Sequence, residues 1–471
     1  MTEHTLAAPT GGFCRFSDNS PAAWSVFFSL MLVPVLPDFL APFVMPLPFL
    51  FSLCSKKGRV RIQAIFSGRR WLLIAAAIFV AVSFLGILPA ISFSGALLTS
   101  GLWAFCFLSM LGVAASLRGE NDLHLALCGL YAGLLVQSVL AILQGIHFTT
   151  NMPFWNPFWA PLEKIVMQLF PFIEVDLSFS AERSTAAFTN SGVFGFYLVM
   201  CAPFCFYLIS RAKNLKQATL FSLPLAAAVI SLMLTYSRMS YITFLTLLFY
   251  LLIAYALVHF RKLKRSYRVL VGVSLTVAIP VGVVILAFLL PDAVTDRFLS
   301  AFRADNSINA RLAIWGKAVP WLFSREPWRL LFGFGTGVQC TWEAFRSISR
   351  WLTEATGFDV PHAHNLFIQL LMEGGILRLA SFAFLMLAVF FRCFKTLQTQ
   401  SDKGKYFLIS LSGFFLALLL NGLTDYVFVD PKICFLFFAF LGVIFVLPTI
   451  TFPEEERAEL SLKLTKRKKR K

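Results

Sequence analysis

Long apolar runs separated by short polar or basic segments make up most of this chain. The runs stay apolar over about 15–25 residues, the length that a helix needs to cross the hydrocarbon core of a bilayer. They lack the period-two alternation of membrane barrel strands, and a backbone in lipid is otherwise satisfied only in helices. We therefore predict an all-α fold, a polytopic transmembrane helical bundle of about twelve spans. The predicted spans lie near Ala23–Leu36, Phe39–Leu53, Trp71–Pro89, Gly95–Ser116, Leu123–Phe148, Gly192–Ser210, Ala218–Tyr236, Ser240–Phe260, Val269–Leu290, Asn365–Phe391, Tyr406–Thr424 and Ile433–Leu447.

Composition and charge place the spans in a membrane and orient them. The 471 residues are 58% hydrophobic, with a mean hydropathy of +0.75. The net charge is +17, and 27 of the 41 Lys and Arg residues fall in alternate connections between the runs. Cytoplasmic loops carry such an excess, so we predict that these connections and both termini are cytoplasmic. They are residues 56–70, 118–122, 211–216, 261–268, 392–405 and 457–471.

The alternation divides the chain into five segments. Residues 1–22 are predicted as a cytoplasmic tail, 23–290 as a bundle of about nine spans with an outward loop at 149–191, and 291–364 as a large helical periplasmic loop. Residues 365–450 are predicted as C-terminal spans, and 451–471 as a basic tail that binds anionic lipid headgroups rather than nucleic acid. The first apolar run is expected to be retained as a span.

Ionisable side chains gather at the outward ends of the predicted spans. Charge in the middle of the membrane is typical of transporters, whereas charge at one face is typical of enzymes that act on lipid-linked substrates. Arg238 lies in the very short connection 235–240, where an outward arginine is unusual. It is interpreted either as a snorkelling residue on a headgroup phosphate or as a guanidinium that grips a diphosphate in bidentate fashion.

The outward loop after Pro291 contains a second arginine with helical spacing around it. Apolar residues from Ile308 to Leu322 predict an amphipathic helix, with Arg311 at the border of its apolar stripe. Arg311 and Trp315, one turn apart, are interpreted either as part of a binding site or as a surface cation–π pair. Arg303 is a weaker candidate. The glycine-alternating turn at residues 331–337 lacks the sequence of a phosphate loop and is expected to be a flexible turn.

Two imidazoles and an amide stand where this loop meets the next apolar run. Because His362 and His364 are two residues apart, we expect a helix that begins at Pro361 to aim only one of them at a site, with Asn365 capping or orienting. Either histidine can instead be a helix-start or interfacial residue. Glu373 lies deeper in the apolar run, where a carboxylate is costly unless paired, and Arg378 is its nearest cation.

These segments resemble the O-antigen ligase and polymerase family, bacterial integral-membrane glycan transferases of the GT-C type. The resemblance rests on His364-Asn365 followed after nine residues by Gly375, on Glu373-Gly374-Gly375-Ile376-Leu377, and on Arg311-Leu312-Ala313-Ile314-Trp315. Ser237-Arg238 and Phe188-Thr189-Asn190 are similar to upstream elements of the family, so the match runs from about Phe188 to Arg378. Arg378 departs from the pattern, because members of the family usually carry glycine there.

The resemblance implies a substrate and a set of roles. The donor would be an undecaprenyl-diphosphate-linked glycan at the periplasmic face of the inner membrane, in lipopolysaccharide biosynthesis. Arg238 and Arg311 would hold the diphosphate, and His364 would act on the acceptor hydroxyl as general base, with inversion at the anomeric carbon. His362, Asn365, Trp315, Glu373 and Arg303 are expected in substrate binding.

Three functions remain open at this point. The chain is interpreted as a ligase that transfers a glycan to lipid A–core, as a polymerase or protein-glycosylating relative, or as a lipid-linked glycan transporter. The last is disfavoured because the sequence shows no internal repeat and few mid-membrane charges. The cysteines show no metal-ligand spacing and no Asp-x-Asp occurs, so we predict neither a metal nor a cofactor.

Overall fold

The computed structural model describes residues 20–67, 71–150, 183–212, 214–260, 306–346 and 360–450. All regular elements in these ranges are helical, which confirms the predicted all-α fold. Arg303 and the predicted span Val269–Leu290 lie outside the described residues.

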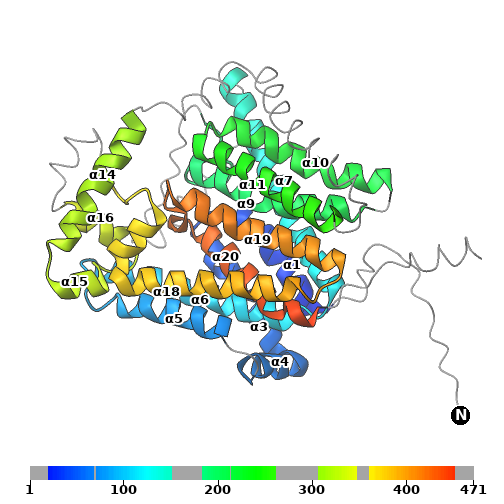
Figure 1. The fold of residues 1–471 in the computed structure, drawn as a ribbon, viewed down its shortest axis with the longest axis horizontal. Coiled ribbons are helices and arrows are strands. Elements are labelled where there is room, and N and C mark those ends of the chain that lie inside the picture. Colours follow the sequence, from blue (N-terminus) through cyan, green and yellow to red (C-terminus); the bar gives the residue numbers. More distant parts are fainter. Residues whose placement is uncertain are drawn as a thin grey trace, which may run out of the picture.

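The helices divide into a bundle and a smaller group at one end of it (Figure 1). The bundle contains α1 (Pro21–Val35), α2 (Ala41–Val44), α3 (Leu47–Cys54), α4 (Lys56–Ser67), α5 (Trp71–Leu85), α6 (Phe93–Ser116), α7 (Glu120–Thr150), α9 (Ser191–Ser210), α10 (Leu215–Leu234), α11 (Arg238–Phe260), α18 (Leu366–Leu397), α19 (Asp402–Gly422) and α20 (Pro431–Val446), with 3-10 turns η3 (Val427–Val429) and η4 (Leu447–Thr449). The smaller group contains α14 (Asn306–Phe323), α15 (Pro327–Phe332) and α16 (Val338–Arg346), and is called the cap below.

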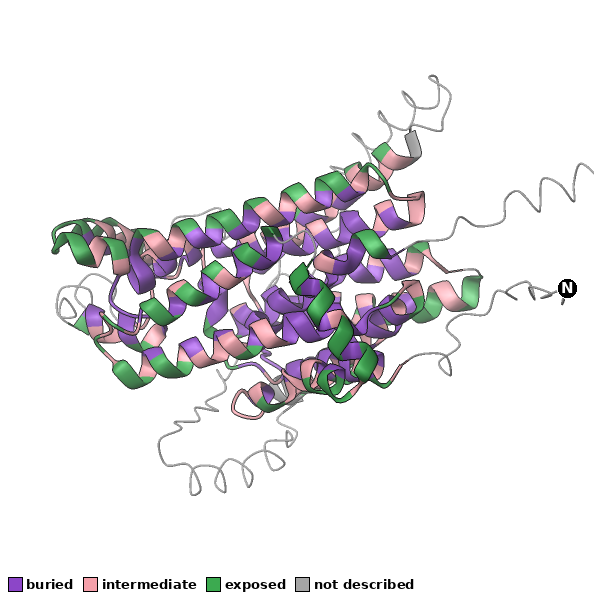
Figure 2. Ribbon diagram, turned by 90° about the horizontal axis from the view of Figure 1, so that it is seen from below, coloured by how far each residue is buried: buried purple, intermediate pink, exposed green. Residues whose placement is uncertain are grey.

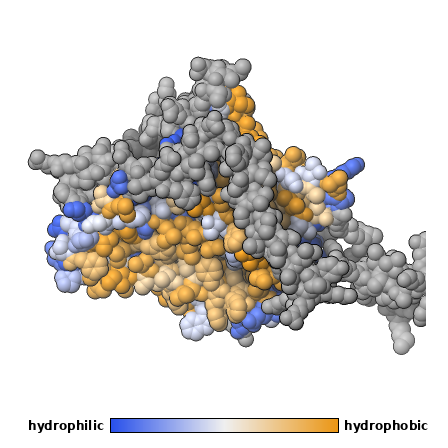
Figure 3. Space-filling model, turned by 45° about the horizontal axis from the view of Figure 1, so that its top comes forward, coloured by the Kyte–Doolittle hydropathy of each residue, from blue (hydrophilic) through white to orange (hydrophobic). Residues whose placement is uncertain are grey.

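Eight of the described helices are long and apolar enough to cross a membrane: α6, α7, α9, α10, α11, α18, α19 and α20. The pair α4 and α5, bent by 90°, would be a ninth, whereas α1 and the segment Ala41–Cys54 are apolar but shorter. A broad hydrophobic surface with hydrophilic residues toward its edges fits this reading (Figure 3). The count of twelve stays a prediction.

Polar side chains begin many of these helices. A side-chain oxygen before the first turn accepts a hydrogen bond from a backbone N–H that the helix itself leaves without a partner. The residues that cap in this way are Ser20, Ser92, Asn190, Asn214, Asn365, Ser401 and Asp430. The predicted span starts differ from the observed ones by a few residues, because apolar content alone does not identify the cap.

The connections between helices alternate between two ends of the bundle. At the end that carries the cap, here called the site end, the N–H of Ile91 donates to the carbonyl of Phe334. At the opposite end, here called the far end, Arg211 pairs with Glu120 at 3.0 Å. The alternation agrees with the chain order that the basic connections predict, and the orientation across a membrane stays a prediction.

The interior of the bundle is aromatic and centred on α20. Phe440 of α20 stacks on Phe204 of α9 with ring centroids 4.5 Å apart, and Phe79 meets Trp103 edge-on at 5.2 Å. Buried residues line the inner faces of the helices, and exposed apolar residues face outward (Figure 2). A helix in lipid is expected to have this distribution, because apolar side chains are stable on both of its faces.

The cap has a small hydrophobic core of its own. It contains Ile314, Ala318, Leu322, Phe334, Ala344, Phe345, Val360, Ala363 and Met372. The predicted amphipathic helix is therefore present as α14, although its buried stripe runs through Ala310, Ile314, Ala318 and Leu322. Leu312, within the same apolar pattern, is outside this buried stripe and is 54% exposed. Because Val360 and Ala363 flank His362, this core fixes the polar segment before α18.

Helix α18 is broken where it meets the cap. Gly374 and Gly375 have non-helical backbone angles, with φ of 62° at Gly375. The turn at 333–337 fills the break, because the N–H groups of Phe334 and Gly335 donate to the carbonyls of Met372 and Glu373 at 2.9 Å each. The glycine-alternating turn, expected from the sequence to be only a flexible connection, thus supplies hydrogen bonds that the broken helix lacks.

Candidate functional site

The two histidines lie in the segment before α18 and not on the helix. The prediction that the helix begins at Pro361 is wrong: α18 begins at Leu366, with Asn365 as its cap. The imidazole centroids of His362 and His364 are 4.1 Å apart, and the N–H of His364 donates to Nδ1 of His362 at 3.2 Å. The non-helical backbone therefore brings both rings to the same place, where a helix would have separated them.

His364 meets a carboxylate that the sequence did not single out. Its Nδ1 lies 3.4 Å from Oδ1 of Asp425, in the connection between α19 and α20. Burial by itself raises the pKa of Asp425, but the hydrogen bond from His364 and the charges of His362 and Arg311 outweigh it and hold that pKa well below its usual range. Asp425 is thus a carboxylate that faces Nδ1 of His364, and Nε2 takes no part in this contact.

His362 occupies a more enclosed position beside Tyr426. Burial and the neighbouring His364 lower the pKa of His362 to about 4, so this imidazole is neutral at pH 7. Its ring centroid is 6.1 Å from that of Tyr426. Burial and the facing Glu373 carboxylate raise the pKa of the Tyr426 phenol, which therefore keeps its proton.

Helix α14 brings Arg311 and Trp315 to the histidines. The charge of Arg311 acts on both His362 and Asp425, which places its guanidinium near the pair. The indole N–H of Trp315 donates to the carbonyl of Ala363 at 2.8 Å. Trp315 therefore supports the backbone between the two histidines. The alternative interpretation, a surface cation–π pair of Arg311 and Trp315, did not include this hydrogen bond.

Asn365 joins the histidine segment to the Asp425 connection. Its Oδ1 accepts from the N–H groups of Phe367 and Ile368 at 3.0 Å, and its Nδ2 donates to the carbonyl of Leu423 at 2.7 Å. Both ends of the amide are used, so this residue caps and orients, as the sequence suggested.

Below the histidines lies a buried polar chain from α16 to α18. Gln369 accepts from the N–H of Ala363 at 2.9 Å, and donates to Thr341 at 2.8 Å and to Glu373 at 3.0 Å. Glu373 is fully buried, and its charge acts on that of Arg378 deeper in the bundle.

Arg378 packs between aromatic rings of the bundle core. Its guanidinium carbon lies 3.9 Å from the centroid of Phe79 and 5.0 Å from that of Trp103, and Nη1 donates to the carbonyl of Phe79. A cation in this place is stabilised by ring faces and by one backbone carbonyl.

Arg238 stands at the first residue of α11, beside the start of α9. The hydroxyl of Ser240 contacts the carbonyl of Gly192 at 3.5 Å, and a side chain at Gly192 would approach Asp425 to 3.4 Å. Asn190 caps α9 by accepting from the N–H of Gly192 at 2.6 Å. The upstream segments that resembled the family therefore lie against the Asp425 connection, at the same end as the histidines.

The site contains donors that suit a phosphate and donors that suit a metal ion. Arginine guanidinium groups match phosphate oxygens in bidentate fashion. The ligand atoms of His362, His364 and Asp425 also lie within 4.8 Å of one another, a donor set that can hold a divalent cation. The predicted absence of a metal is untested by this geometry and stays a prediction.

The fold and the site define a polytopic helical membrane protein with a histidine–carboxylate pair and arginines gathered at one end of its bundle. Residues 221–383 match the family model described as O-antigen ligase. The family match over these residues confirms the resemblance seen in the sequence. The match covers most of α10, then α11, the cap and the first half of α18, and it ends before Asp425. A comparison with curated proteins gives no match.

Proposed function

We propose that this protein transfers a glycan from undecaprenyl diphosphate to an acceptor hydroxyl at the site end of the bundle. The match to the O-antigen ligase family model supports a lipid-linked glycan donor and a glycan acceptor. The observation that carries the proposal is the contact of His364 with Asp425 at 3.4 Å, with the charge of Arg311 acting on the same carboxylate.

His364 acts as the general base. A hydroxyl that attacks an anomeric carbon must lose its proton as the new bond forms, and an imidazole suits that task near neutral pH. Since Nδ1 of His364 faces Asp425, Nε2 takes the proton from the acceptor. Asp425 holds the ring in place and stabilises the imidazolium that results.

The arginines act on the leaving group. The bond from the anomeric carbon to the diphosphate oxygen breaks while the bond to the acceptor oxygen forms, so negative charge accumulates on the diphosphate. Arg311 and Arg238 stabilise this charge, without a divalent metal. A single displacement of this kind inverts the configuration at the anomeric carbon.

We further propose that the site end faces the periplasm and the far end the cytoplasm of a bacterial inner membrane, with both termini cytoplasmic. The described basic residues Lys56, Lys57, Arg59, Arg61, Arg118, Arg211 and Lys216 lie at the far end, in agreement with the positive-inside rule. The acceptor that we propose is lipid A–core. A second lipid-linked repeat, as in a polymerase, or a protein hydroxyl would use the same chemistry.

An assay of the purified protein tests the proposal. It contains undecaprenyl-diphosphate glycan, EDTA and one of three acceptors: lipid A–core, a second lipid-linked repeat, or a protein. We expect transfer to lipid A–core, and loss of transfer in His364→Ala and Arg311→Ala. Arg346→Ala, which removes an exposed arginine at the end of α16, is the matched control and is expected to retain activity.

The other outcomes select among the alternatives. Transfer to a different acceptor would identify the polymerase or protein-glycosylating branch. Activity that EDTA abolishes and a divalent metal restores would contradict the metal-independent mechanism. Movement of the donor across liposomes without product on any acceptor would make the protein a transporter.

A further inference from the structure

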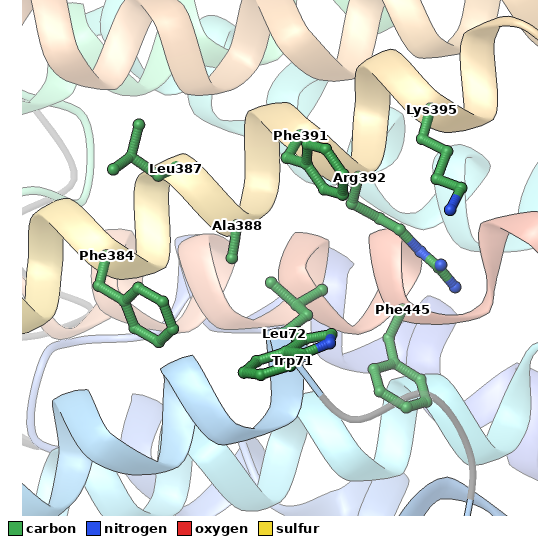
Figure 4. A pocket seen from close by; sticks show the side chains of 9 residues that line it. All are labelled: Trp71, Leu72, Phe384, Leu387, Ala388, Phe391, Arg392, Lys395 and Phe445. Atoms are coloured by element: carbon green, nitrogen blue, oxygen red, sulfur yellow. The ribbon is translucent and has the colours of Figure 1, made fainter.

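A pocket of about 690 Å³ opens on the far half of α18, remote from the histidines (Figure 4). It lies between α18, α5 and α20, and its volume is within the range of roughly 300–1,000 Å³ typical of ligand pockets. The residues that line it are Trp71, Leu72, Phe384, Leu387, Ala388, Phe391, Arg392, Lys395 and Phe445.

The pocket has an apolar part, here called the trough, which is lined by Leu72, Phe384, Leu387, Ala388 and Phe391. Two cations stand at one end of it. Leu387 and Phe391 are 69% and 68% exposed, so the trough is open to the surroundings of the bundle. Arg392 and Lys395 extend from α18 at one end of the pocket, near Phe445, whereas Phe384 lies toward the other end. An apolar chain attached to an anionic head group matches both parts.

The position along α18 identifies the end of the membrane to which the cations belong. Arg392 follows Asn365 by 27 residues. Arg392 and Lys395 stand in the last two turns of α18, whose first residue, Leu366, is at the site end. The cations therefore reach the head-group region opposite the site, where phosphates of membrane lipids lie.

We propose that this pocket binds an anionic phospholipid, with the phosphate head group on Arg392 and Lys395 and one acyl chain along Leu72, Phe384 and Leu387. Zwitterionic lipids are disfavoured, because their own cation would face two more. A second copy of the chain is disfavoured for the same reason, since it would bring its own arginine and lysine to the contact. This inference is independent of the transfer reaction proposed for the site end.

Trp71 provides a signal that is specific to the pocket. It is 74% exposed and is one of ten tryptophans in the chain. Bromine on a lipid acyl chain quenches tryptophan on contact, so the quenching lost in Trp71→Phe reports on lipid in this pocket alone. The full-length protein is reconstituted in phosphatidylcholine vesicles with increasing brominated phosphatidylglycerol, and the relative affinity of the two lipids is fitted.

The proposal predicts a preference for phosphatidylglycerol that depends on the two cations. The double variant Arg392→Gln and Lys395→Gln is expected to lose roughly tenfold to thirtyfold in its affinity for phosphatidylglycerol relative to phosphatidylcholine. Each cation near an anionic lipid raises that relative affinity by about fivefold. The matched control Lys57→Gln and Arg59→Gln removes the same charges from α4, outside the pocket, and is expected to retain the preference.

A second variant tests the trough without changing charge. Ala388→Phe fills the pocket, and is expected to reduce the quenching of Trp71 by brominated phosphatidylglycerol while the cations remain. Equal affinities for the two lipids in the unaltered protein would overturn the proposal, and so would an unchanged preference in the double variant. A preference for a polyisoprenyl phosphate over phosphatidylglycerol would also overturn the proposal. It would show that the pocket binds the donor lipid and not a phospholipid.

Discussion

The backbone of His364 is held in a conformation that few residues other than glycine adopt. Its φ is 45°, in the left-handed region. Such a conformation costs on the order of 1–3 kcal/mol and persists only where the surroundings determine it. The preceding residue, Ala363, is fixed on both sides, by Trp315 at its carbonyl and by Gln369 at its N–H. The position of the imidazole is therefore imposed by its neighbours.

Replacing His364 by asparagine separates chemistry from conformation. Asparagine tolerates the left-handed region, so His364→Asn should keep the fold while it removes the proposed base. We expect the initial rate of glycan transfer to fall by about 10²–10⁴, the usual contribution of general acid–base catalysis. His362→Asn, which removes the imidazole whose pKa is lowered to about 4, should cost less. A larger loss in His362→Asn would reverse the assignment of the base.

Asp425 is expected to act through His364. Asp425→Asn keeps the size of the side chain and removes the charge that stabilises the imidazolium, so the transfer rate should fall by at least about tenfold while the apparent KM for donor changes little. Asp425→Glu should restore part of the rate, because it returns a carboxylate. Equal rates for the asparagine and glutamate variants would show that Asp425 is only structural.

The sequence predicted part of this site for a physical reason. His364 and Arg311 stand in local patterns that differ from their apolar surroundings, and the structure brings both to the same end of the bundle. Asp425 was missed because it lies 61 residues from His364 and stands alone after an apolar run. The only signal in the sequence was a single carboxylate at the outward end of a predicted span. Asp38 has the same position relative to its span, so this signal does not distinguish Asp425 from Asp38.

At the scale of helices and turns, two glycine breaks fit together. A side chain at Gly375 would lie 2.3 Å from the backbone of Leu331, and one at Gly333 would lie 2.5 Å from the backbone of Glu373. Both glycines also have positive φ. The turn of the cap and the break in α18 can approach this closely only because neither residue has a side chain.

Gly375→Ala should therefore destabilise the protein. The added carbon meets backbone atoms that cannot rotate away, and φ is unfavourable, so we expect a loss of about 2–4 kcal/mol, measured as a lower Tm in detergent. Gly101→Ala is the control, since a side chain there meets nothing within 4 Å and alanine favours a helix interior. If both variants had the same Tm, the close fit would be unimportant for stability.

The helices themselves were predicted better than their interruptions. The length of the apolar runs in the sequence was enough to locate α6, α7, α9, α10, α11, α18, α19 and α20. It could not show the break at Gly374 and Gly375, because the apolar pattern continues through the break and its cause is the distant turn at 333–337. A glycine pair in an apolar run is equally compatible with an unbroken helix.

Across the whole molecule, one buried lysine connects three distant parts of the chain. Nζ of Lys432 lies 2.8 Å from Oδ1 of Asp38, donates to the carbonyl of Ala187, and lies 4.5 Å from the ring centroid of Phe188. Its side chain is fully buried. Asp430, which caps α20, lies nearby, and burial together with Asp38 raises the pKa of Asp430 to about 7.

The two carboxylates should differ in their effect on stability. Asp38→Asn leaves the charge of Lys432 buried without its partner, so we expect a loss of about 3–5 kcal/mol. At about pH 5, where Asp430 keeps its proton in the folded protein, Asp430→Asn keeps the cap and should cost under about 1 kcal/mol. Thermal unfolding in detergent measures both, and a greater loss in Asp430→Asn would assign the pairing to Asp430 instead.

Asp430 also predicts a pH dependence. Its folded pKa of about 7 lies above the unfolded value, about 3.9. The folded protein therefore binds the proton more tightly, and its stability should fall as pH rises from about 4 to 7. In Asp430→Asn this part of the slope should disappear. An identical profile of Tm against pH in the variant would contradict the raised pKa.

The order of the helices along the chain could be predicted, whereas their arrangement could not. Basic connections predict the alternation between the two ends, because charge resists crossing the bilayer. Nothing in an apolar run shows that α20 lies at the centre of the bundle or that α4 forms a separate helix, since these depend on how side chains from distant runs pack. The cap core likewise joins residues from three segments that share no local pattern.

The break in α18 also bears on how the protein adapts to different membranes. Residues before the break are fastened to the cap, whereas residues after it pack on α5 within the bundle. Bilayers differ in thickness by a few ångströms, and spans respond by tilting or by changing length. The longer half of α18 can tilt or acquire a different apolar sequence in response, while the histidines keep their distance from Asp425. Membrane fit and the geometry of the histidine segment are thus free to evolve separately on a single helix.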